Sequence, residues 1–262
     1  MTDFAEEVSP ILDTISVGGV PTVRLTGQQL ADLMVEDCHR ARRSPGTPPK
    51  IVVSSNGATI AQFHSQPAFR KSLLQADVID ADGMPLVIAS RLFCSRPLQE
   101  RVATTDFIHT ASEAAVANGL KFYFLGAKPG VAEEAARRLR HKHCGLKIVG
   151  IRDGYFRASE EKGICEEVQD SGADVLWVGL GSPRQERFAV EHRDDLRGVG
   201  WIRTCGGLFD HTAGAVPRAP QWMQDHGLEW LHRVRMEPRR LAWRYLTTNP
   251  AAAFHLVTKT HD

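Results

Sequence analysis

Two acidic residues stand at the end of an apolar run in this sequence. In the segment IDADGMPLV, Asp80 and Asp82 occupy the place where open parallel sheets present ligand contacts. Asp80-Ala81-Asp82 has the form of the Asp-X-Asp pair with which many nucleotide-sugar enzymes hold a divalent metal. Such short matches are common by chance, and no further ligand cluster accompanies this one. From these residues alone, an aspartate that begins a turn before Gly83 is the simpler interpretation.

A second candidate site is the glycine-rich turn in ADVLWVGLGSPRQERF. Here an apolar strand leads into Gly179, Gly181 and Ser182, and a helix follows. Glycines at such a turn let a diphosphate approach the backbone, and the N–H groups of the helix start favour its charge. The third glycine of GxGxxG is missing and no acid for a ribose follows, so a dinucleotide dehydrogenase fits poorly. Gln185 and Glu186 have a simpler interpretation as polar residues of the first helical turn.

Arginines and tryptophans alternate between residues 206 and 246. Arginine suits phosphate oxygens and tryptophan suits a membrane interface, so this stretch predicts contact with a phosphorylated ligand that is partly lipid. From Pro217 onward, seven Lys/Arg stand against four Asp/Glu, a net charge of +3 within a chain of formal charge +1. The alternative interpretation is a solvated basic helix that packs on the core through its aromatic residues.

The elements that must position these residues alternate along the chain. We expect strands at 50–55, 76–80, 120–127, 146–151, 173–181 and 199–207, separated by amphipathic segments with helical spacing. This alternation predicts an α/β fold, a Rossmann-like, mostly parallel sheet flanked by helices. A small β element comes first, followed by a helix that we expect Thr26 to cap.

The sequence changes character near its C-terminal end. Pro217, Pro220, Pro238 and Pro250 divide this part into short helical pieces. We therefore predict a Rossmann-like domain over residues 1–216 and a basic, aromatic helical appendage over residues 217–262.

Composition narrows the class of protein. A chain of 262 residues with 42% hydrophobic residues can bury a substantial core, and its near-neutral charge gives no reason to expect nucleic acid. The five cysteines are widely spaced and odd in number, which favours a reduced compartment over a disulfide framework. The N-terminal segment does not resemble a signal peptide, and no run approaches the ~20 apolar residues that span a bilayer. Any membrane contact is therefore expected to be peripheral.

Several motifs, in order along the chain, carry a resemblance to one family. The runs VVSSNGATI, IDADGMPLV, ERVATTDFI, FLGAKPGVAEEAARRL, VGLGSPRQE and RAPQWMQDHGLEWLHRVRMEPRRL resemble the signatures of the WecG/TagA/CpsF family of bacterial glycosyltransferases. The resemblance covers roughly residues 14–250. It implies a Rossmann-like transferase that joins a nucleotide-activated sugar to a polyprenyl-diphosphate-linked acceptor.

The resemblance also assigns roles to single residues. It implies that Asp82 is the general base on the acceptor hydroxyl and that Arg101 neutralises the leaving diphosphate, with Asp80 as a helper or structural residue. The bland alternative for Arg101 is a surface pair with Glu100 or Asp106. The implied substrate-binding residues are Ser54, Asn56, Gly126, Gly179, Gly181, Ser182 and Gln185, and the implied lipid-diphosphate residues are Arg233, Arg240 and Arg244. No metal or cofactor is expected.

Two of the departures from the family pattern lie beside the implied base and at the implied lipid-diphosphate site. Pro85 replaces the second glycine of the DGxG motif, directly after the implied base. Trp243 replaces one residue of a terminal arginine pair, which leaves Arg244 alone at that place. One phosphate contact is thus exchanged for an interfacial ring.

The function that the resemblance implies is inverting and metal-independent transfer from a UDP-sugar to a polyprenyl-diphosphate-linked saccharide, in the assembly of a cell-surface or extracellular polysaccharide. The expected location is cytoplasmic, with peripheral attachment to the inner face of the plasma membrane. Homo-oligomerisation stays open. Two alternative functions also stay open: a non-catalytic sensor or binder of polyprenyl-linked sugars, and a metal-dependent transferase that uses Asp80 and Asp82.

Overall fold

The core of the protein is a parallel sheet of six strands. The computed structural model describes residues 12–236 and 238–262, and of residues 233 and 238–245 it describes the backbone alone. The strands lie in the order β4-β3-β8-β7-β5-β6, and every neighbouring pair is parallel. Their bounds are β3 Lys50–Ser55, β4 Val78–Ala81, β5 Lys121–Gly126, β6 Lys147–Arg152, β7 Val175–Gly179 and β8 Trp201–Thr204. The predicted α/β class and all six predicted strands are confirmed, with ends that differ by a few residues.

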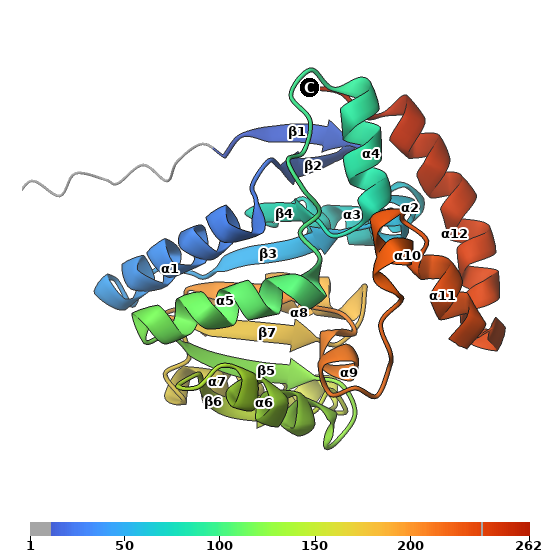
Figure 1. Cartoon of the computed structure of the whole chain (residues 1–262). Coiled ribbons are helices and arrows are strands. Elements are labelled where there is room, and N and C mark those ends of the chain that lie inside the picture. The colour runs from blue at the N-terminus through green and yellow to red at the C-terminus, as the bar shows by residue number, and fades with distance from the viewer. Residues whose placement is uncertain (1–11, 237) are drawn as a thin grey trace, which may run out of the picture.

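Helices cover both faces of this sheet, as Figure 1 shows. The β-strand period of two sends alternate side chains to opposite faces, so each strand contributes to two separate cores. On one face Phe122, Phe124 and Trp177 pack among α1, α5, α6 and α9. On the other face Leu125 and Leu176 pack among α2, α3, α4, α7 and α8. The bounds of these helices are α1 Gly27–Arg43, α2 Gly57–Ser65, α3 Pro67–Leu73, α4 Met84–Phe93, α5 Thr104–Asn118, α6 Val131–Lys142, α7 Glu161–Asp170, α8 Arg184–Glu191 and α9 Leu208–Thr212. Two short 3₁₀ helices, η1 Ala158–Glu160 and η2 Asp194–Leu196, complete this part.

A small antiparallel hairpin, β1 Thr14–Val17 and β2 Val20–Val23, precedes α1. The expected cap of α1 is confirmed: Thr26 Oγ1 accepts from the backbone N of Gln29, and Gln29 Oε1 accepts from the backbone N of Thr26. This capping box satisfies two backbone donors that the helix itself leaves unpaired.

The C-terminal part forms α10 Gln221–Asp225, α11 Glu229–Met236 and α12 Pro238–Thr258. The prediction that Pro250 divides this part was wrong, because α12 runs through it as one helix of 21 residues. Proline inside a helix removes a backbone hydrogen bond, at a cost of about 3 kcal/mol. Burial offsets that cost: Ala252 and Leu256 are buried, and α12 packs along α2 (Figure 1).

The end of the chain returns to the N-terminal hairpin. His261 and Ser16 exchange two backbone hydrogen bonds of 3.0 Å, and Gly19 N donates to the carbonyl of Lys259 at 2.8 Å. The carboxylate of Asp262 accepts from the backbone N and the hydroxyl of Ser95. Lys259, Thr260 and His261 thus bind to a hairpin more than 200 positions earlier in the sequence. The division at residue 217 stays a prediction, but these contacts tie both ends of the chain to one body.

Candidate active site

The predicted site residues gather at the carboxyl ends of β3, β4 and β8. Ser54 on β3 lies opposite Asp80 on β4, and Asp82 is the first residue after that strand. Strands of a parallel sheet all end at the same edge, which is where open sheets of this class hold their ligands. The sequence argument for Asp80 and Asp82 therefore placed them at the correct edge.

A buried network organises this edge around Arg203. The guanidinium of Arg203, in β8, forms an ion pair with the carboxylate of Asp80, and both side chains are fully buried. Arg203 Nη2 also donates to Ser54 Oγ at 2.7 Å, and Ser54 Oγ donates to Asp80 Oδ1 at 3.0 Å. The guanidinium carbon lies 5.2 Å from the ring centroid of Phe107. Burying two charges is tolerated because each is paired and hydrogen-bonded.

The network reaches Asp82 through Thr104. Thr104 Oγ1 lies 2.8 Å from Ser54 Oγ and donates to Asp82 Oδ2 at 3.3 Å. The backbone N of Asp82 donates to the carbonyl of Ser55 at 2.9 Å, which fixes the main chain at this position. Neither Arg203 nor Thr104 was singled out from the sequence. The one available signal was a charge inside an otherwise apolar strand, WIRT.

The two aspartates therefore differ in environment. The carboxylate of Asp80 is directed inward and engaged by Arg203 and Ser54. Asp82 is half-buried, and its pKa is raised to about 6, first by burial and then by the negative charges of Asp80 and Glu229; Arg101 and Arg203 oppose this rise. A carboxylate with this pKa is mostly ionised at pH 7 and is a stronger base than an ordinary aspartate.

Arg101 lies next to Asp82 because the loop that carries Arg101 is hydrogen-bonded to the end of β4. The backbone N of Val102 donates to the carbonyl of Ala81 at 2.8 Å. The expected contact with Asp106 is present, at 3.5 Å between Asp106 Oδ2 and Arg101 Nη2, but the pair is not a surface pair on the arginine side, because the Arg101 side chain is only 8% exposed. Its Nη1 donates to Glu229 Oε2 at 2.7 Å, and its Nη2 donates to Gln224 Oε1 at 3.1 Å. Both partners belong to the C-terminal helices, which are thereby brought to the site.

The start of α4, directly after Asp82, contacts the same helices. A Cβ atom on Gly227, between α10 and α11, would lie 3.3 Å from Pro85. Gly227 has a φ of +70°, a conformation that glycine adopts without strain. Pro85, one of the departures from the family pattern, therefore packs against the turn between α10 and α11 and helps to position the C-terminal helices. Figure 1 shows α10 and α11 beside the end of α4 nearest the sheet.

The glycine-rich turns of β5 and β7 lie side by side. A Cβ atom on Gly126 would come within 2.3 Å of the Gly179 carbonyl, and one on Gly179 within 3.1 Å of the Gly206 carbonyl. Only glycine permits this approach of three backbones. Gly181 has a φ of +76° with open space around its Cα, and Ser182 Oγ donates to Gln62 Oε1 at 3.0 Å. The structure thus brings the predicted turn residues together at the same edge as Asp82.

Gln185 and Asn56 hold neighbouring segments in place. Gln185 Oε1 accepts from the backbone N of Gly206 at 3.0 Å, and its Nε2 donates to Glu186 Oε1 at 2.8 Å. Both residues lie in the first turn of α8, as the simpler interpretation expected, but they are buried, and burial raises the pKa of Glu186. Asn56 caps α2: its Oδ1 accepts from the backbone N of Ala58 and of Thr59.

Three predicted lipid-diphosphate residues lie on the C-terminal helices. Arg233 is in α11, and Arg240 and Arg244 are in α12. Their side chains fall outside the part of the chain that the structure describes, so their roles stay predictions, as does that of Trp243.

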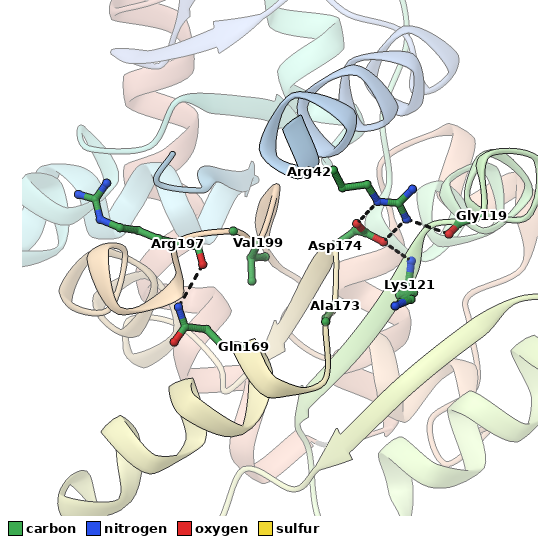
Figure 2. Close-up of a pocket in the computed structure, with 10 residues that line it drawn as sticks. Arg42, Gly119, Lys121, Gln169, Ala173, Asp174, Arg197 and Val199 are labelled. Carbon is green, nitrogen blue, oxygen red and sulfur yellow. Dashed lines mark hydrogen bonds and ion pairs between the residues drawn. The ribbon is translucent and has the colours of Figure 1, made fainter. Parts of the chain in front are cut away.

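A hollow of about 500 Å³ opens at the opposite, amino-terminal edge of the sheet. Figure 2 shows that two of its charged side chains, those of Arg42 and Asp174, bond to each other. Asp174 accepts from Arg42 Nε and Nη2 at 2.6 and 2.7 Å and from the backbone N of Lys121 at 2.7 Å, and Arg42 also donates to the Gly119 carbonyl. These bonds join α1 to the starts of β5 and β7. The hollow therefore looks like a structural junction rather than a site for the predicted chemistry.

Among the residues that the structure describes, no helix is both long enough and apolar enough to cross a bilayer.

Comparison with known proteins identifies relatives along nearly the whole chain. The sequence model of the glycosyl transferase WecG/TagA/CpsF family matches residues 15–261. The chain is also 30% identical over 203 residues to an N-acetylglucosaminyldiphosphoundecaprenol N-acetyl-beta-D-mannosaminyltransferase of Bacillus spizizenii, a match that covers 76% of each protein. All the motifs on which the sequence resemblance was based lie inside the matched span.

Proposed function

Because this chain belongs to the WecG/TagA/CpsF family and is a glycosyltransferase, we propose that it transfers a sugar from a UDP-sugar to a polyprenyl-diphosphate-linked saccharide, with inversion and without a metal. The Bacillus relative is named for transfer of N-acetylmannosamine to N-acetylglucosaminyl-diphosphoundecaprenol, and we propose an acceptor of this chemical class for the present chain. The product would serve the assembly of a cell-surface or extracellular polysaccharide.

The observation that carries this proposal is the position and pKa of Asp82. Its carboxylate follows β4 at the ligand edge of the sheet, is held by Thr104, and has a pKa raised to about 6. In the proposed step, Asp82 takes the proton of the acceptor hydroxyl as the hydroxyl oxygen attacks C1 of the donor sugar. The C1–O bond to UDP breaks on the opposite side, which inverts the configuration at C1.

The departing UDP carries negative charge that the site must stabilise. Arg101 lies beside Asp82, and the Gly179–Ser182 turn presents backbone at the same edge. Positive side chains and backbone N–H groups that are fixed in advance stabilise such charge without reorganisation. We propose that these groups replace a metal ion. The engagement of Asp80 by Arg203 supports this view, because a buried carboxylate that is already paired is poorly placed as a metal ligand.

The polyprenyl acceptor places the reaction at a membrane surface. We propose that the chain attaches peripherally to the inner face of the plasma membrane through α11 and α12. Trp230, Leu231, Met236 and Leu246 are exposed on or near these helices, and arginines accompany them in the sequence. Apolar and aromatic residues beside basic ones are typical of interfacial helices.

The test of this function is transfer from a panel of UDP-sugars to a polyprenyl-diphosphate-linked N-acetylglucosamine, with and without EDTA. We expect one donor to be consumed with stoichiometric release of UDP, at a rate that EDTA leaves unchanged. Loss of turnover in EDTA, restored by a divalent cation, would favour the metal-dependent alternative. Binding of the acceptor without turnover across the panel would favour the sensor.

A further inference from the structure

The C-terminal helices deliver an acidic residue into the candidate active site. Glu229 is the first residue of α11, and its Oε2 lies 2.7 Å from Arg101 Nη1. The side chain of Arg101 is 8% exposed and that of Glu229 is 36% exposed. The guanidinium is therefore shielded from solvent, whereas the carboxylate is partly exposed. A charge-assisted hydrogen bond in such a setting is stronger and more directional than one at an open surface.

A second contact joins the segment before α10 to the first turn of α5. Arg218 donates to both carboxylate oxygens of Asp106, at 2.5 and 3.0 Å. Gln224 Oε1 accepts from both Arg101 and Arg218, at 3.1 and 2.8 Å, while its Nε2 donates to the Ala219 carbonyl at 2.7 Å. Docking of α10 and α11 therefore does not depend on Glu229 alone.

Docking alone would not require an acid at this position. The charged groups that act on Asp82 come from four segments: Asp80 from β4, Arg203 from β8, Arg101 from the loop before α5, and Glu229 from α11. Arg218, from the segment before α10, also interacts electrostatically with both Asp82 and Glu229. Glu229 and Asp80 favour the protonated form of Asp82, whereas Arg101 and Arg203 favour the ionised form. Glu229 thus contributes to the charge balance of the candidate base as well as binding Arg101.

We propose that Glu229 is a positioning residue that the C-terminal helices supply to the active site: its carboxylate holds the Arg101 guanidinium beside Asp82. This inference rests on the proposed function in that Arg101 is the group that meets the donor diphosphate. Glu229 acts through Arg101 and Asp82, and needs no contact with the substrate.

The experiment compares the full-length wild-type protein with Glu229→Gln, Glu229→Asp and Asp106→Asn. The carboxyl carbon of Asp82 is followed by NMR during a pH titration without ligand, and the pH profiles of kcat and KM are measured in parallel. Asp106→Asn is the matched comparison, because it removes a carboxylate that pairs with Arg218 and lies 3.5 Å from Arg101 Nη2, and Asp106 is not among the main influences on the pKa of Asp82.

We expect the Asp82 midpoint near pH 6 in the wild type and at a lower pH in Glu229→Gln, because removal of a neighbouring negative charge favours ionisation. Glu229→Asp keeps the charge and should restore the midpoint toward the wild-type value. Asp106→Asn should leave the midpoint unchanged. Glu229→Gln removes the charged partner at Arg101 Nη1, while Gln224 and Asp106 still contact Nη2. Because the guanidinium is then held less firmly, kcat should fall on the order of tenfold, with the acid limb of its profile moved the same way as the NMR midpoint.

Two results would overturn the inference: an Asp82 midpoint in Glu229→Gln that equals or exceeds that of the wild type, or an equal shift in Asp106→Asn. If Glu229→Gln fails to fold, Glu229→Asp still decides, because it keeps the charge but shortens the reach to Arg101. Positioning then predicts a lower kcat with an Asp82 midpoint near the wild-type value, and an unchanged kcat would overturn the inference. If the wild type shows no turnover with any donor, the proposed function fails, while the NMR titration still decides whether Glu229 controls Asp82.

Discussion

The two edges of the same sheet use charged residues in different ways. At the amino-terminal edge, Asp174 accepts three hydrogen bonds from Arg42 and the Lys121 backbone, and Asp77 accepts from Arg193, from Lys50 and from the backbone N of Ile51. Both carboxylates join segments that are distant in sequence. Charges at this edge therefore serve to fasten the fold.

At the carboxyl-terminal edge, some buried polar and charged side chains keep hydrogen-bonding atoms that are not used within the protein. Arg203 Nε, Glu186 Oε2 and Ser55 Oγ are buried and have no hydrogen-bond partner among the atoms that the structure describes. The pKa values of Asp82 and Glu186 are raised, chiefly by burial. Residual hydrogen-bonding capacity and perturbed pKa values gather at functional sites, because chemistry needs groups that still have something to gain from a ligand.

The strongest test of this contrast is Asp82→Asn. Loss of a general base typically reduces kcat by about 10²–10⁴-fold, and we expect a loss of that size in the transfer assay. The variant should also be more stable than the wild type at pH 7. Because the pKa of Asp82 is raised in the folded protein, its ionised form costs folding free energy above pH 6, and asparagine removes that cost. Thermal unfolding at pH 7 measures this effect.

Asp80→Asn is the matched control for that prediction. It changes an aspartate two residues away, but one that is fully buried and paired with Arg203. We expect it to lower stability, since Arg203 would be left without its charged partner. Near-normal turnover in Asp82→Asn, or equal unfolding temperatures for the two variants, would break the proposed distinction between the two acids.

Much of the fold was predictable because it depends on short-range pattern. Runs such as VLWVG are apolar on both faces, as a strand covered by helices must be, and glycines mark the ends of β5 and β7. Pro250 shows where local reasoning fails. Its expected helix break did not occur because α12 packs along α2, about 200 positions earlier in the sequence, and sequence pattern does not reveal that contact.

The candidate site was predictable in part for the same reason. The edge occupied by Asp82 and the glycine turns follows from the parallel direction of the strands, because parallel strands all end at the same edge of the sheet. The partners of these residues do not: Arg203 reaches Asp80 across β3, and Glu229 reaches Arg101 over more than 100 positions. The sequence also placed Gln185 and Glu186 in the first turn of a helix, where they lie, but did not reveal that both side chains are buried.

The next largest effect is expected from Arg203→Met, which removes the cation at the centre of the carboxyl-terminal edge. Breaking a buried ion pair by removing one partner costs roughly 3–5 kcal/mol, because the other charge stays buried and unpaired. Chemical denaturation should show a loss of this size. The double variant Arg203→Met/Asp80→Leu should recover much of it, since apolar residues of similar volume need no partner. A double variant no more stable than the single one would show that Asp80 is not the source of the cost.

The smallest effect, on stability alone, is expected at the amino-terminal edge from Asp174→Asn. The Asp174 side chain is 7% exposed and forms an ion pair with Arg42. This pair links α1 to the start of β7 (Figure 2). Asparagine keeps the shape but loses the charge and one acceptor oxygen, so we expect a loss of about 1–3 kcal/mol in unfolding free energy. Because this edge lies at the far end of the strands, kcat and KM should stay at wild-type values.

Asp170→Asn provides the control for that variant. Asp170 is an exposed aspartate at the end of α7, near the same amino-terminal edge of the sheet. It should change neither stability nor rate. If Asp174→Asn lowered kcat and left the unfolding free energy unchanged, the hollow around Arg42 would be a functional region. The assignment of a purely structural role to the charges of the amino-terminal edge would then be wrong. A purely structural role for Asp174 predicts a loss of stability without a loss of rate. A carboxylate whose oxygens are all hydrogen-bonded within the protein has no hydrogen-bonding capacity left for a substrate.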